Sequence, residues 1–100
     1  LGPSLVTADE VPDLRSIHVV TTLNGTVVQD QSIGEMIWGV AELIAYISAF
    51  TPLGPGDVIA TGTPGGVGSK RTPPLWMKPG DSVSVSIGSI GTLTNPIVAE

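Results

Sequence analysis

β-Branched residues gather on either side of the dipeptide Asn24-Gly25. Residues 15–23 and 26–30 are rich in Val, Ile and Thr, side chains that favour the extended backbone of a strand. Asn-Gly supplies the two positive-φ positions of a type I′ turn, which joins antiparallel strands directly. The pattern therefore predicts a β-hairpin over residues 15–30.

A helical spacing of apolar residues follows the hairpin. Apolar side chains recur three and four positions apart and form one stripe, namely Met36, Ile37, Val40, Leu43, Ile44, Ile47 and Phe50. We expect a helix over about 39–50, because Glu42 then occupies the first turn, where the helix dipole favours an acidic residue. Pro52 ends this helix, since proline lacks the amide donor and clashes with the preceding turn.

The second half of the chain contains shorter elements. Residues 58–60 are an apolar run that predicts a short strand, and a glycine-rich loop (residues 61–68) follows it. Ser alternates with Val or Ile over residues 82–87, the period of a half-buried strand. Residues 92–99 are predicted as a last strand, which Pro96 places at the edge of a sheet. The fold class is therefore α+β and β-rich, with one main helix.

Composition excludes several classes of function. Hydrophobic residues make up 41% of the chain, enough to form a core, and the net charge is −5. The chain therefore lacks the positive surface that binds nucleic acids or anionic membranes. Without cysteine there is no disulfide scaffold and no thiol nucleophile, which is compatible with the cytoplasmic location that we expect. No apolar run approaches the roughly 18 residues of a membrane span.

The first residues predict an irregular segment. Residues 1–14 contain Pro3, Pro12 and several carboxylates, a composition typical of a covering loop. The chain opens on Leu1, in the middle of a motif, so we expect residues 1–100 to be part of a longer polypeptide. Its low share of charged residues, 13%, fits a surface that faces another part of the same protein.

The glycine-rich loop is the first candidate for chemistry. It lacks the Gly-Lys-Ser/Thr ending of a phosphate-binding P-loop and the Gly-x-Gly-x-x-Gly of a dinucleotide site. Its glycines allow the backbone to approach a ligand, and the hydroxyls of Thr61 and Thr63 can donate to an anionic oxygen. A tight turn with solvated threonines explains the same residues. Nearby basic residues either attract an anion or form a solvated surface, namely Lys70, Arg71 and Lys78.

The other candidates are weaker. Asp9 and Glu10 are adjacent, so their side chains diverge on an extended chain, and Glu35 and Glu42 share a helix face only if the helix begins early. A hard divalent cation needs several carboxylate oxygens at one place, and we expect no complete metal site in this chain. His18 has no nucleophile or carboxylate at a catalytic spacing, so an ordinary polar role is favoured over catalysis.

Several stretches, taken in order, resemble the C-terminal part of the fumarylacetoacetate hydrolase (FAH) family. They are Gly2-Pro3-x-Leu5-Val6-Thr7-Ala8-Asp9-Glu10, Asn24-Gly25 with Gln29-Asp30, the helical segment 40–48, the segment 53–68 with its run GDVIATGTPGGVG, Lys78-Pro79-Gly80-Asp81, and Gly91-Thr92-Leu93-x-Asn95-Pro96-Ile97-Val98. The resemblance covers essentially the whole chain, and the run at 56–68 is its most specific part.

The resemblance implies a fold and a chemistry. The FAH fold is a mixed β-sandwich roll, usually assembled as a homodimer, and its members act on 2-oxo, 2,4-dioxo or enol acids. The family site holds Mg²⁺ or Mn²⁺ through a Glu-x-Glu pair and an Asp, and the metal polarises the substrate oxygens. In the hydrolases a His–Glu pair activates water. These groups belong to segments before residue 2, so we expect the metal ligands upstream and assign no metal ligand or catalytic residue here.

The resemblance does transfer a substrate-binding role to the glycine-rich loop. Thr63 matches the family threonine whose hydroxyl contacts the substrate, and Gly62 and Pro64 shape its approach, with Thr61 in the same site. His18 does not match the catalytic histidine. At position 4 the family often has Trp where this chain has Ser4, from which we expect only a local packing change.

The sequence thus predicts part of a divalent-metal-dependent enzyme for acylpyruvate- or fumarylpyruvate-type acids, acting by C–C bond hydrolysis. A hydroxyheptadienedioate-type isomerase and an oxaloacetate-type decarboxylase are alternatives on the same scaffold. An alternative from another class is a catalytically inactive β module for dimerisation. We expect these 100 residues alone to be inactive.

Overall fold

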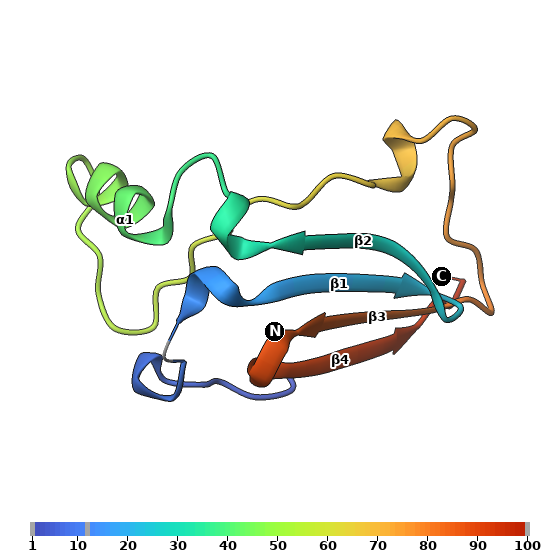
Figure 1. Cartoon of the computed structure of the whole chain (residues 1–100), viewed down its shortest axis with the longest axis horizontal. Coiled ribbons are helices and arrows are strands. Elements are labelled where there is room, and N and C mark those ends of the chain that lie inside the picture. Colours follow the sequence, from blue (N-terminus) through green and yellow to red (C-terminus); the bar gives the residue numbers. More distant parts are fainter. Residues whose placement is uncertain (1, 12, 100) are drawn as a thin grey trace.

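The described part of the chain folds into one antiparallel sheet and one α-helix, joined by long irregular segments (Figure 1). The computed structural model describes residues 2–11 and 13–99. Four strands pair in the order β2-β1-β3-β4, namely β1 (His18–Leu23), β2 (Thr26–Ser32), β3 (Ser82–Ile87) and β4 (Gly91–Pro96). The helix α1 is Val40–Ser48, and the 3₁₀ turns are Ala8–Glu10, Leu14–Ser16, Ile33–Glu35, Gly68–Lys70 and Gly88–Ile90. The α+β class with one main helix is confirmed, and the described residues contribute a single sheet.

The hairpin forms where Asn24-Gly25 predicts it. Asn24 has φ 51° and Gly25 φ 79°, the two positive values of a type I′ turn. The strand register shifts between Thr21, which pairs with Gln29, and Thr22, which pairs with Val27, so Val28 is an extra residue in β2. The first strand begins three residues later than predicted, because Leu14–Ser16 form a 3₁₀ turn instead.

The other two predicted strands are also present. β3 covers residues 82–87 as expected, and β4 is an edge strand that ends at Pro96. The prediction extended this strand to residue 99. It stops earlier because the next residue, Ile97, exchanges backbone hydrogen bonds with the turn residues Gly80 and Asp81 rather than with a strand.

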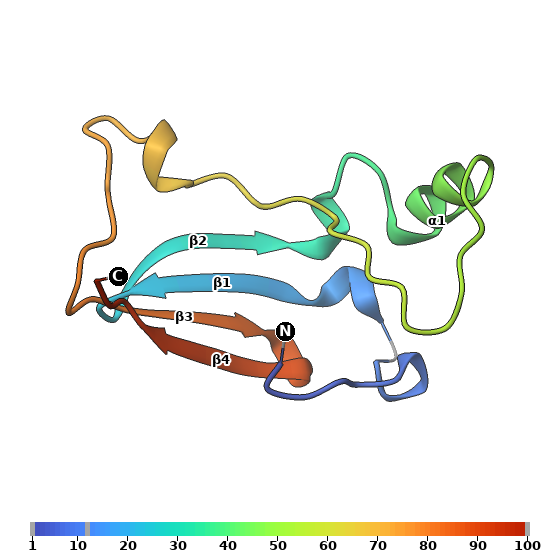
Figure 2. The same cartoon turned by 180° about the vertical axis from the view of Figure 1, so that it is seen from behind.

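The helix begins and ends close to its predicted limits. The Gly39 amide donates to Glu42 Oε2 at 2.7 Å, which satisfies one of the free amides at the start of α1. Met36 and Ile37 precede the helix, so the predicted stripe begins outside it. Both views place α1 beyond the end of the sheet at which β2 finishes (Figures 1 and 2), and none of its residues is buried. No helix among residues 2–11 and 13–99 is long and apolar enough to cross a bilayer.

The strand predicted at residues 58–60 is wrong. These residues have no regular secondary structure, and none of the described residues pairs with their backbone. A short apolar run becomes a strand only when a neighbour completes its hydrogen-bond ladder. Val58 remains 67% exposed, so burial of its side chain does not stabilise an extended segment that lacks a paired strand.

The described part of the chain has a very small core. Ile17 is the single buried hydrophobic residue within 2–11 and 13–99, and the sheet faces carry half-buried and exposed side chains. The radius of gyration is 15.4 Å, above the about 13 Å typical of a compact domain of this length. Of the predicted covering loop at 1–14, positions 1 and 12 lie outside the described residues, and the rest is irregular apart from two 3₁₀ turns.

Candidate functional site

The glycine-rich loop forms one wall of an open cavity of about 850 Å³. Residues 61–65 line this cavity, so all four predicted site residues reach it. The opposite walls come from residues 31–33 and 35–38 and from the start of α1, with three more apolar residues, namely Leu14, Val19 and Ile87. The cavity lining therefore combines the threonines and glycines of the loop with mostly apolar residues from the other segments.

Three of the loop residues that line this cavity are exposed to solvent. Thr61, Gly62 and Thr63 are exposed, and Pro64 is half-buried. Gly62 has φ +99°, a conformation that side chains rarely adopt, although a Cβ there would meet nothing within 4 Å. Glycine is thus needed at this position for the backbone angle and not for space.

A glutamine on β2 holds the loop. Gln29 Nε2 donates to Thr63 Oγ1 at 3.1 Å and to the Pro64 carbonyl at 2.9 Å. Its Oε1 accepts from Thr21 Oγ1 at 2.9 Å. Sequence reasoning missed this role: Gln29 belongs to the stretches that resemble the FAH family, but no spacing signal links it to a partner 34 residues away.

Arg71 holds the same loop at a second point. Its Nε donates to the Gly66 carbonyl at 2.9 Å, and its Nη2 donates to the Val28 carbonyl. The backbones of the loop and of β2 come so close here that a Cβ on Gly66 would lie 2.2 Å from the Val28 carbonyl oxygen. Arg71 therefore binds backbone. Lys70 and Lys78 are exposed, and none of the three basic residues lines the cavity.

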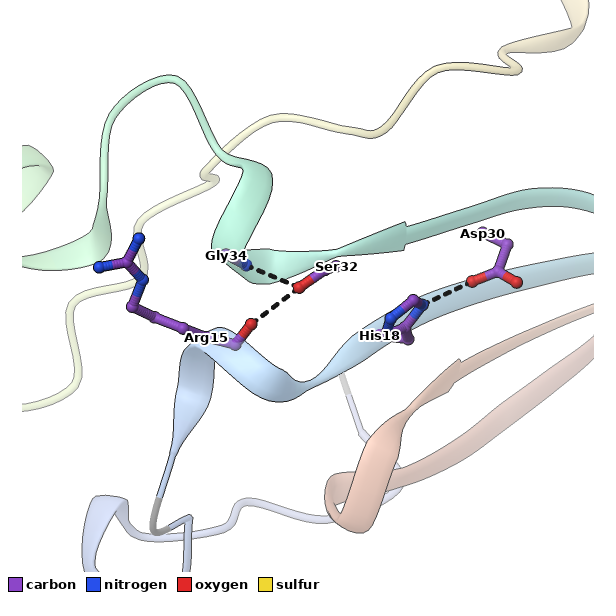
Figure 3. A network of polar contacts seen from close by, with 5 residues as sticks. All are labelled: Arg15, His18, Asp30, Ser32 and Gly34. Atoms are coloured by element: carbon purple, nitrogen blue, oxygen red, sulfur yellow. Dashed lines mark hydrogen bonds and ion pairs between the residues drawn. The ribbon is translucent and has the colours of Figure 1, made fainter.

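His18 lies away from the cavity. Its Nδ1 is 2.8 Å from Asp30 Oδ1, and Figure 3 shows the two side chains facing each other from β1 and β2. Both are more than half exposed, and neither residue lines the cavity. This is an exposed polar pair of the kind that contributes little to stability, so the structure assigns His18 no part in the candidate site.

A serine fixes the segment at the cavity edge. Ser32 Oγ donates to the Arg15 carbonyl at 2.7 Å and accepts from the Gly34 amide at 3.0 Å (Figure 3). Gly34 fits tightly, because a Cβ there would lie 2.7 Å from the Arg15 carbonyl oxygen. These contacts set the path of residues 32–35, which the sequence left undetermined.

Three aspartates serve turns in the described part of the chain. Asp13 accepts from the Arg15 amide and Asp57 from the Gly54 amide. The pKa of Asp81 lies below its ordinary value, mainly because Asn24 Nδ2 donates to it, with further help from the Lys78 amide. Within residues 2–11 and 13–99, no three His, Asp or Glu side chains could hold a metal ion together.

Comparison with known proteins gives consistent matches. The family model described as fumarylacetoacetate (FAA) hydrolase C-terminal matches residues 1–98. A protein of Staphylococcus saprophyticus is 48% identical over 95% of this chain and 32% of its own length. The solved structure of fumarylacetoacetate hydrolase from Exiguobacterium antarcticum superposes with a TM-score of 0.92 at 41% identity, covering 99% of this chain and 35% of that one.

Solved structures of proteins with different activities also match almost the whole chain. A 5-carboxymethyl-2-hydroxymuconate delta-isomerase from Mycobacterium smegmatis gives a TM-score of 0.84 at 39% identity, covering 99% of this chain and 36% of its own. Maleylpyruvate hydrolase from Sphingobium sp. SYK-6, in complex with manganese(II) and pyruvate, gives 0.86 at 33% identity, covering 97% and 34%. The chain spans about a third of the length of these relatives.

Proposed function

The chain belongs to the fumarylacetoacetate hydrolase family, and on that premise we propose that it supplies the carboxylate-binding loop of an enzyme that hydrolyses a C–C bond in a small 2-oxo or 2,4-dioxo acid. One observation carries the proposal: Thr63 lines the cavity and is held there by Gln29. Relatives of this chain include both hydrolases and isomerases.

The two sides of the cavity suit such an acid. The Thr61 and Thr63 hydroxyls are donors that an anionic oxygen can accept from. Backbone amides of a glycine-rich loop add further donors to an anion. Across the cavity, Met36, Ile37 and Trp38 present an apolar surface to the carbon chain of the substrate. In this proposal the chain's own residues bind the carboxylate, orient the acid and leave the bond-breaking groups to other parts of the protein.

We further propose that those other parts lie in the two thirds of the relatives' length that this chain does not span. The maleylpyruvate hydrolase relative is in complex with manganese(II) and pyruvate, which supports a divalent cation, Mg²⁺ or Mn²⁺, in the complete site. Residues 1–100 are then one partial domain that turns over no substrate alone. A homodimer remains the expectation that the family resemblance gives.

A direct assay tests the function. The full-length protein carrying this chain, supplied with Mn²⁺, is mixed in separate reactions with an acylpyruvate, a hydroxyheptadienedioate-type acid and oxaloacetate, and the products are identified. Release of pyruvate supports C–C hydrolysis. Conversion to an isomer favours the isomerase alternative, which the delta-isomerase relative supports, and release of carbon dioxide favours a decarboxylase. Absence of any turnover favours the inactive β module.

The role of Thr63 is tested in the same assay. Thr63→Val should lower kcat/KM about tenfold, the effect of one hydrogen bond to a charged group. Thr63→Ser keeps the hydroxyl and should retain most of the wild-type kcat/KM. Thr94→Val is the matched control, because Thr94 lies on the edge strand and contacts Ser84 rather than the loop. An unchanged kcat/KM in Thr63→Val would remove Thr63 from the site.

A further inference from the structure

We propose that Gln29 is a positioning residue that aims the Thr63 hydroxyl hydrogen at the substrate carboxylate. The inference rests on the proposed function, since it concerns the same loop. It adds a group from β2 that sets the direction of the key hydrogen bond. The contacts of Gln29 with Thr21, Thr63 and Pro64 carry it.

The orientation of the Gln29 amide follows from its neighbours. The Pro64 carbonyl only accepts hydrogen bonds, so the Gln29 atom 2.9 Å from it must be the amide nitrogen. At the other end of the amide, the Thr21 hydroxyl donates to Oε1. A flipped amide would place two acceptors against each other, so the network itself selects one orientation.

This orientation determines what Thr63 can do. One hydrogen of Gln29 Nε2 points to the Pro64 carbonyl, and the other points to Thr63 Oγ1, which therefore accepts. The hydrogen of the Thr63 hydroxyl must then point elsewhere, and no acceptor for it lies among the described residues. Thr63 lines both this cavity and a smaller one of about 290 Å³ that Gln29 and Thr21 also line. In this proposal the Thr63 hydroxyl donates into the larger cavity, to a ligand atom that accepts, such as a carboxylate oxygen.

The sheet keeps Gln29 in place. Gln29 is half-buried on β2 and pairs in register with Thr21 on β1, so its side chain starts from a hydrogen-bonded ladder. Arg71 also ties the loop to β2, but its contact is with Gly66 and not with Thr63. Gln29 is thus the described residue that connects the sheet to the donor hydroxyl.

Pyruvate binding by the full-length protein tests the inference. Isothermal titration with Mn²⁺ present measures the pyruvate dissociation constant for Gln29→Leu, Thr63→Val and the double variant. Each single change should weaken binding about tenfold, the effect of losing one hydrogen bond to a charged group. The double variant should be no weaker than either single one, because both changes break the same chain of contacts.

A pair of neighbouring threonines gives a milder version of the same test. Thr21→Val removes the donor to Gln29 Oε1 and should weaken pyruvate binding about threefold, the effect of a partner one step removed. Thr22→Val is the control. Thr22 is also half-buried on β1, points to the other face of the sheet and has no side-chain hydrogen bond among the described residues. Thermal unfolding of each variant checks that the fold is retained.

The outcomes separate the inference from the proposed function. If Thr63→Val weakens pyruvate binding and Gln29→Leu does not, the positioning role is overturned while the proposed function stands. If the loss of pyruvate-binding free energy in the double variant equals the sum of the losses in the two single variants, Gln29 acts independently of Thr63 and the inference also fails. If wild-type protein does not bind pyruvate, or Thr63→Val binds it unchanged, the proposed function and the inference fall together.

Discussion

The Asn24-Gly25 turn and the glycine-rich loop are both built on positive-φ residues, but they are held in different ways. The turn closes on neighbouring strands, its two φ values are those of a type I′ reversal, and the Asn24 side chain adds bonds to Ser82 and Asp81. The loop has positive φ at Gly62 and Gly66, yet its position depends on Gln29 and Arg71, which lie on β2 and beyond the loop. Glycine thus shows where a backbone can bend, and the tethering side chains determine where a long loop goes.

The largest expected effect comes from adding a side chain at the glycine where the loop backbone lies closest to β2. Gly66→Ala places a Cβ 2.2 Å from the Val28 carbonyl oxygen at φ +101°, so the loop must leave β2. We expect a loss of about 3 kcal/mol in the free energy of unfolding of the full-length protein, measured in urea. Gly62→Ala is the matched control, with the same φ but open space, and should lose about 1 kcal/mol. Equal losses would show that contact with β2 does not hold the loop.

Removing the second tether should have a smaller effect. Arg71→Met deletes the hydrogen bonds to the Gly66 and Val28 carbonyls, and we expect a loss of about 2 kcal/mol in unfolding free energy. Arg71→Lys should not restore it, because an ammonium group lacks the forked geometry of guanidinium.

The control for this prediction is Arg15→Met, since the Arg15 side chain is exposed and has no hydrogen bond among the described residues. Amide exchange at residue 66 should accelerate in Arg71→Met and not in Arg15→Met. Unchanged exchange in both variants would contradict the tethering role.

The smallest effect is expected at the hairpin turn. Asn24→Gly keeps the positive φ but removes the bonds of Asn24 to the Ser82 amide and to Asp81, and loss of the neutral bond to Ser82 should reduce stability by about 1 kcal/mol. Asn24→Ala should lose more, because alanine also disfavours the positive φ. Comparing the two variants in urea separates the backbone angle from the side-chain bonds.

The same turn predicts a pH dependence. The pKa of Asp81 is lowered in the folded protein, first by Asn24, so its contribution to stability is present above the ordinary value of 3.8. That contribution is lost as the pH falls through the lower, folded-state pKa. Asn24→Gly should therefore lose less stability than the wild type on acidification below pH 3.8. Parallel curves for the two proteins would contradict the role of Asn24.

Much of the fold could be predicted from local patterns. The hairpin, the helix and the strand at 82–87 each carry their own period or turn signal, and each is present. The run at 58–60 carries only an apolar composition. It is not a strand, because strand formation depends on a hydrogen-bonding neighbour that a short segment cannot specify.

The residues of the candidate site also differ in whether a local sequence signal identifies them. Thr61, Gly62, Thr63 and Pro64 were identified in the sequence from loop chemistry and family resemblance, and all four line the cavity. The tethering contacts of Gln29 and Arg71 were not identified, although both residues were named in the sequence, because Gln29 lies 34 residues from Thr63 and Arg71 lies 43 residues from Val28. Hydrogen bonds across such separations arise only when the sheet brings the segments together.

By itself the sequence determined the elements whose signals are local: the type I′ turn at Asn24-Gly25, the helix that follows Gly39 and the edge strand that ends at Pro96. It also determined the family to which the chain belongs. The tertiary structure decided which residues hold the loop, namely Gln29 and Arg71, and it made the Thr63 hydroxyl oxygen the acceptor of the Gln29 amide. The physical reason is range. Backbone propensity acts over a few neighbouring residues, whereas the direction of a hydroxyl hydrogen depends on whichever donor the fold places beside it.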